Sequence, residues 1–75
     1  EVFNNIMQKS GETNLARLRK ERKLSQSELA KAADISIRSI QLYEQRKTDI
    51  NKAQYNHLKS IAKVLGCIPE DLLEE

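Results

Sequence analysis

The sequence predicts a small all-α domain made of five short helices, and three observations support this fold class. Apolar residues recur every three or four positions along most of the chain, which is the spacing of one face of a helix. Residues that start and stop helices separate these segments, with Ser or Thr before them and Gly after. Runs of Val, Thr and aromatic residues, which are typical of strands, are missing from the 75 residues.

Composition fits one soluble domain, with 39% hydrophobic and 32% charged residues. The longest apolar run is far too short to span a membrane, and no signal peptide is recognisable. One Cys and one His exclude a disulfide framework and a closed metal site built from this chain alone. A reducing cytoplasm is the simplest location for such a chain. We expect no cofactor and no membrane partner.

Charge is unevenly distributed along the chain. Residues 66–75 contain four acidic residues and no basic one, so residues 1–65 carry a net charge of +6. Five basic residues fall within positions 17–23. This distribution favours an anionic partner on one face, although a cluster of this kind is equally compatible with a solvated helix surface.

The N-terminal half is predicted to form two helices after a separate leading segment. Residues 1–13 form a short amphipathic segment or the remnant of a longer chain, and residues 14–75 form the domain. Thr13 or Asn14 caps a helix over residues 15–23. The run SQSE at 25–28 is a capping box that starts a helix at Gln26. This helix lasts barely two turns before Asp34, where the chain must bend and a left-handed conformation is tolerable.

The C-terminal half is predicted to contain three more helices. Ser36 caps the third helix, over residues 37–45, and a polar loop covers residues 46–50. The fourth helix runs over residues 51–65 and ends at Gly66, a favoured C-cap residue. Pro69 suits the first turn of a last short helix. Its Leu72 and Leu73 would close the core.

Residues 26–45 have the pattern of a helix-turn-helix motif, in which the second helix enters the DNA major groove. Apolar residues occupy the positions where the two helices must meet each other and the core: Leu29, Ala33, Ile35, Ile40 and Tyr43. The second helix keeps an outward face that contains two exposed aliphatic residues. It comprises Ser36, Ile37, Arg38, Gln41, Leu42 and Gln45.

The run LRKERKLSQSELAKAADIS at 18–36, followed by Ile40, Tyr43-Glu44 and the IAKVLG of 61–66, resembles the Cro/repressor-type (XRE) helix-turn-helix family. The resemblance covers about residues 14–75. It implies a compact, five-helix, lambda-repressor-like domain that binds double-stranded operator DNA, usually as a homodimer on a two-fold symmetric site. Asp34 and Arg46 stand where the family usually has Gly.

The resemblance also implies roles for individual residues. Arg19 and Glu44 would form a structural ion pair. The residues expected to read base edges are Ser36, Ile37, Arg38, Gln41 and Leu42. The residues expected at phosphates are Gln26, Gln45, Arg46, Lys47, Asn51 and Lys52. Two other residues are expected to have no functional role. We expect His57 at the surface and Cys67 as a small buried hydrophobe.

Two functions compete for this pattern. The first is a sequence-specific DNA-binding transcriptional regulator, or the DNA-binding domain of one. The alternative is a protein-interaction module, such as an antitoxin-like partner of a toxin, in which Ile37 and Leu42 occupy a protein groove and DNA binding is secondary. An enzyme is not expected, because no cluster of His, Cys or paired carboxylates has the spacing of a catalytic or metal site.

Overall fold

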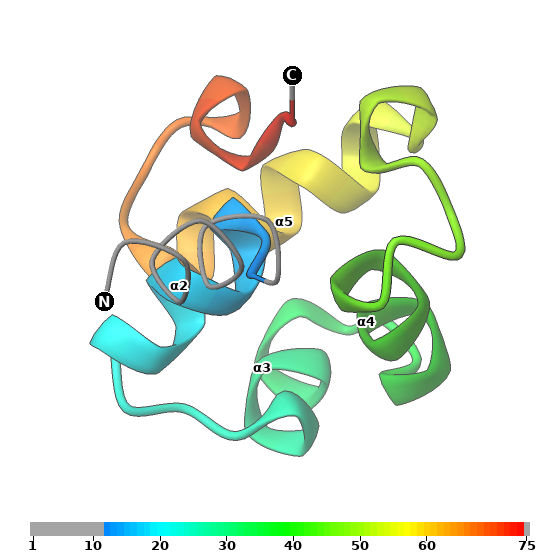
Figure 1. Ribbon diagram of the computed structural model, residues 1–75. Coiled ribbons are helices and arrows are strands. Elements are labelled where there is room, and N and C mark those ends of the chain that lie inside the picture. The colour runs from blue at the N-terminus through cyan, green and yellow to red at the C-terminus, as the bar shows by residue number, and fades with distance from the viewer. Residues whose placement is uncertain (1–11, 75) are drawn as a thin grey trace, which may run out of the picture.

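The computed structural model describes residues 12–74, and in this range the chain forms four α-helices and two 3-10 turns (Figure 1). The prediction for residues 1–13 therefore falls mostly outside the described residues. The α-helices are α2 (Asn14–Glu21), α3 (Gln26–Ala33), α4 (Ile37–Glu44) and α5 (Tyr55–Leu65). The 3-10 turns are η1 (Ile50–Lys52) and η2 (Pro69–Leu72).

Side-chain caps determine where the first three of these helices begin. Thr13, Ser25 and Ser36 each accept a hydrogen bond from the backbone N–H three residues further along the chain. Ser25 also takes part in the complete capping box that the sequence predicts. α5 ends at Gly66, whose φ of 72° lies in the left-handed region that favours glycine. The starts of the three helices and the end of α5 are thus confirmed.

The observed helix α5 is shorter than the helix predicted over residues 51–65. Asp49 caps the 3-10 turn η1, and its carboxylate accepts a hydrogen bond from the backbone N–H of Asn51. Ala53 and Gln54 then adopt extended backbone conformations, so the α-helix begins only at Tyr55. Ile50 is buried, which fixes the turn against the core and forces the chain to change direction before α5.

The predicted count of five α-helices is not met within residues 12–74. The segment that begins at Pro69 is a four-residue 3-10 turn, too short for a ladder of α-helical hydrogen bonds. The backbone N–H of Leu73 bonds to the carbonyl of Glu70, three residues back. The first helix also stops at Glu21, before the predicted end near Lys23, because Lys23 adopts a left-handed φ of 59°.

One hydrophobic core joins these elements. α3 packs against both α4 and α5, and η2 packs against α5 (Figure 1). Leu72 is fully buried and Leu73 is half-buried, so the C-terminal turn closes the core as predicted. The largest fully buried side chains come from all of these elements except η1: Leu15, Leu29, Ile40, Ile61, Leu65 and Leu72. None of the helices in the described part of the chain has the length and apolar character needed to cross a bilayer.

Candidate nucleic-acid interface

The turn between α3 and α4 is three residues long and is closed by local hydrogen bonds. Asp34 adopts the left-handed conformation, with a φ of 59°, and the backbone N–H of Ile35 bonds to the carbonyl of Ala30 at 2.9 Å. Ser36 then caps α4. Ala30 and Ala33 are buried, and their small side chains allow the two helices to approach closely. The sharp bend therefore comes from backbone conformation and small residues together.

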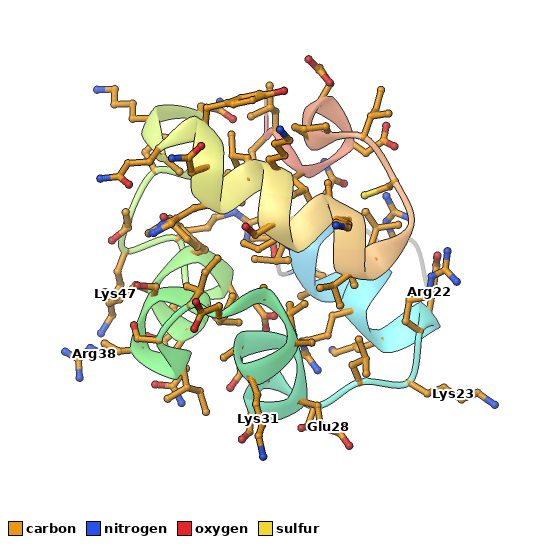
Figure 2. All side chains as sticks on the ribbon, turned by 180° about the vertical axis from the view of Figure 1, so that it is seen from behind. Arg22, Lys23, Glu28, Lys31, Arg38 and Lys47 are labelled. Carbon is orange, nitrogen blue, oxygen red and sulfur yellow. The ribbon has the colours of Figure 1, made fainter. Side chains whose placement is uncertain are left out.

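α4 has an inner and an outer face, as the sequence predicts. Ile40 and Tyr43 are buried, whereas Ile37 keeps 42% of its surface exposed. Arg38 is exposed and extends away from the body of the domain (Figure 2). Of the other predicted base-reading residues, Ser36 is exposed, while Gln41 and Leu42 are half-buried. The outer face thus offers a cation, an amide and apolar surface.

A network of hydrogen bonds fixes the C-terminal end of α4. Glu44 accepts two hydrogen bonds from Arg19, one from Nε to Oε2 at 2.7 Å and one from Nη2 to Oε1 at 3.0 Å. Arg19 also donates to the carbonyl of Leu24 at 2.7 Å, and Gln26 donates its amide N–H to Glu44 at 2.9 Å. Only 11% of the Arg19 side chain and 7% of the Glu44 side chain are exposed. The network therefore ties α2, the start of α3 and the end of α4 together.

The predicted phosphate contacts fall into two groups, according to whether their side chains have partners inside the domain. Arg46 turns toward the ends of the domain, with Nη2 lying 3.5 Å from Oε1 of Glu74. The side-chain amide of Asn51 also bonds to Glu74, through its backbone. Together with Gln26, these residues have partners inside the domain. Lys47 instead extends outward on the same side as Arg38 (Figure 2). Gln45 and Lys52 are exposed as well.

Three residues outside the predicted DNA-contacting set, Tyr43, His57 and Cys67, lie at or near the core. Tyr43 Oη is 3.3 Å from Nδ1 of His57. His57 is half-buried on α5, whereas the sequence predicted a surface position. Burial raises the pKa of Tyr43. Cys67 is half-buried against the core, a partial match to its prediction, and burial followed by the charge of Asp71 raises the pKa of its thiol. Within residues 12–74, no three His, Cys, Asp or Glu side chains form a metal-binding group.

Glu74 is a residue that the sequence did not single out. Its carboxylate accepts a hydrogen bond from the backbone N–H of Asn14 at 2.7 Å, and its backbone pairs with Asn51. These partners lie 60 and 23 positions away along the chain. No local pattern signals such contacts, because the partners of Glu74 lie so far away along the chain.

A short first helix, a three-residue turn and a second helix with a buried and an exposed face define a helix-turn-helix domain. The model of the Cro/C1-type HTH DNA-binding domain family matches residues 14–74, and the chain belongs to that family. The resemblance seen in the sequence is thereby confirmed. Comparison with curated proteins gave no significant match, and comparison with solved structures gave none either.

Proposed function

We propose that this chain is a sequence-specific DNA-binding transcriptional regulator, or the DNA-binding domain of one, with α4 placed in the major groove. The observation that carries the proposal is the outer face of α4. Arg38 and Ile37 are exposed on a helix whose opposite face is fixed in the core by Ile40 and Tyr43. A rigid helix with a free polar and apolar face is what base reading requires.

The chemistry of this face supports specific roles. Arg38 can donate two hydrogen bonds to O6 and N7 of guanine, and Gln41 can pair with adenine. Ile37 and Leu42 provide apolar surface for a thymine methyl group. Ser36 lies at the helix start, where its hydroxyl already accepts the backbone N–H of Ser39. The same hydroxyl also lies 3.0 Å from Oγ of Ser39, and we assign the hydrogen-bonding capacity that remains to a base or a phosphate.

Phosphate contacts are assigned first to exposed polar and basic residues beside this face. Lys47 extends on the same side of the domain as Arg38, and Lys52 and Gln45 are exposed near it in sequence. Gln26 engages Glu44 through its amide N–H, so its contact to a phosphate is assigned to the backbone N–H groups at the start of α3. A homodimer on a two-fold symmetric site would place two copies of α4 in successive major grooves.

Binding to a mixed-sequence DNA duplex at several salt concentrations tests the electrostatic part of this proposal. The logarithm of the binding constant should fall linearly with the logarithm of salt, by about 0.9 for each phosphate neutralised. Selection from a random duplex pool should then yield one enriched sequence. Absence of binding at low salt would contradict the proposal.

The exposure of Ile37 favours the alternative function, a protein-interaction module with an antitoxin-like role. In that case Ile37 would enter an apolar groove of a protein, and complex formation would depend weakly on salt. Ile37→Asp would abolish the protein complex while leaving weak, salt-dependent binding to mixed-sequence DNA. Under the leading proposal, the same variant loses its preference for the selected sequence.

A further inference from the structure

The polar contacts of Glu74 reach three parts of the domain: the start of α2, the loop that follows α4, and the turn η1. Its backbone N–H donates to Oδ1 of Asn51 at 2.8 Å, and its backbone carbonyl accepts from the same amide. Its carboxylate has two partners. Oε2 accepts a hydrogen bond from the backbone N–H of Asn14, and Oε1 lies 3.5 Å from Nη2 of Arg46. Only 24% of the Glu74 side chain is exposed. The carboxylate is therefore held in place by its surroundings.

Arg46 is directed toward this carboxylate by its own backbone and by a second contact. Its φ of 59° is left-handed, and its Nη2 also donates to the carbonyl of Glu12 at 3.2 Å. The guanidinium thus lies between the segments that precede α2 and follow η2. Lys47, the next residue, extends outward beside Arg38 (Figure 2). Two adjacent cations in one loop consequently have different surroundings.

We propose that Glu74 is an intramolecular counter-charge that competes with the DNA backbone for Arg46, and so attenuates DNA binding. This inference rests on the proposed function. With 41% of its side chain exposed, Arg46 is within reach of an approaching phosphate. To contact that phosphate, it must first leave the carboxylate of Glu74. While the pair persists, the loop offers the DNA one cation fewer, and both affinity and salt dependence are reduced.

Glu74→Gln is the variant that isolates the charge. The glutamine keeps an oxygen that can accept the N–H of Asn14, and its backbone keeps both bonds to Asn51. Glu70→Gln is the matched control, because Glu70 is an exposed acid in η2 and its replacement changes the net charge equally. Each protein is titrated with a mixed-sequence DNA duplex over a range of salt concentrations, and circular dichroism checks that each is folded.

Glu74→Gln is expected to bind the duplex several-fold more tightly at low salt than the unmodified chain. Its salt slope should be steeper by about 0.9, the value for one additional phosphate contact. Glu70→Gln should keep the original slope. Equal slopes for Glu74→Gln and the unmodified chain would overturn the inference, and so would an equal steepening by both variants, which would indicate only a change in overall charge.

Arg46→Ala provides the second test, and its effect in the unmodified chain does not depend on the stability of Glu74→Gln. In the unmodified chain it should leave the slope unchanged, and in the Glu74→Gln background it should remove the added slope. Loss of about one slope unit from Arg46→Ala alone would overturn the inference, because Arg46 would already contact DNA. If neither the unmodified chain nor Glu74→Gln binds DNA, the proposed function fails. If both bind with equal slopes, only this inference fails.

Discussion

Arg19 and Glu44 form a nearly buried ion pair in which Nε and Oε2 lie 2.7 Å apart. The pair joins α2 to the last residue of α4. Because α4 carries the proposed base-reading face, the same contact that stabilises the domain also fixes the angle at which that face is presented. The resemblance to the family implies this pairing, and the structure places the two side chains in direct contact.

Loss of one partner of this pair is expected to destabilise the domain strongly. Glu44→Ala leaves the guanidinium of Arg19 without its carboxylate partner and with little access to solvent. For a buried pair, this loss lowers the free energy of unfolding by roughly 3–5 kcal/mol. The Arg19→Ala/Glu44→Ala double variant should lose less than the sum of the two single losses, because neither charge then remains unpaired. Urea unfolding of all four proteins measures this coupling. Additive losses would show that the pair contributes nothing as a unit.

The solvent-exposed pair of Arg17 and Glu21, in α2, is the matched control. The two residues are four positions apart on one helix and are 3.3 Å apart at their closest charged atoms. Their coupling in the same experiment should be only about 0.3–0.5 kcal/mol, because water screens both charges.

Asp34→Gly is expected to stabilise the turn between α3 and α4. Asp34 has a φ of 59°, a conformation in which an L-residue with a side chain is strained by roughly 1–2 kcal/mol. Glycine removes this strain but loses more chain entropy on folding, roughly 0.5–1 kcal/mol. The free energy of unfolding should therefore rise by about 1 kcal/mol or less. A decrease would show that the Asp34 side chain contributes more than its backbone strain costs.

Gly66→Ala should have the opposite effect on the free energy of unfolding. Gly66 has a φ of 72°, and an added Cβ would clash with Nη2 of Arg22. The guanidinium can move aside, so the main cost is the left-handed backbone, about 1 kcal/mol or more. Thermal unfolding followed by circular dichroism measures both variants. A neutral Gly66→Ala variant would contradict this explanation of the end of α5.

The buried phenol of Tyr43 predicts a loss of stability at alkaline pH. Burial raises its pKa, since the phenolate would be poorly solvated beside the core. This contribution is fully present below the unfolded-state pKa of about 10 and is lost as pH rises through the higher folded-state pKa. Tyr43→Phe removes the ionising group. Its free energy of unfolding should fall less than that of the unmodified chain over this range, and parallel pH profiles would contradict the prediction.

Local sequence signals predicted the parts of the fold that depend on neighbouring residues. Ser25 and Glu28 are three positions apart, so their capping box can be read directly, and Gly66 marks the end of α5 in the same way. The break at Ala53 and Gln54 was missed because neither residue is a strong helix breaker. Burial of Ile50 controls it, and that burial depends on the rest of the core.

The faces of α4 could be predicted from the sequence, but the partners of the residues beside it could not. Helical spacing separated Ile37 and Arg38 from Ile40, because the faces of one helix follow from its period. The partners of Arg46 and Asn51 could not be foreseen. Both side chains engage Glu74, which reaches them only after the whole chain has folded back.

Lys47→Ala is expected to weaken DNA binding by a similar factor on all sequences. The ammonium group extends outward beside the proposed reading face and would neutralise one phosphate (Figure 2). The salt slope should fall by about one unit. Lys63→Ala, which removes an exposed cation from the last turn of α5, is the control and should leave the slope unchanged. Equal effects of the two variants would mean that only net charge matters.

The central claim, that the outer face of α4 reads bases, is tested most directly by the sequence preference of Arg38→Ala. Duplexes selected from a random pool by the unmodified chain are re-measured with the variant, together with every single-base substitution. We predict a preference lost at one base pair by roughly 1–3 kcal/mol, with the other positions unchanged. A uniform loss over all duplexes, with every preference retained, would contradict base reading by Arg38 and reassign it to the DNA backbone.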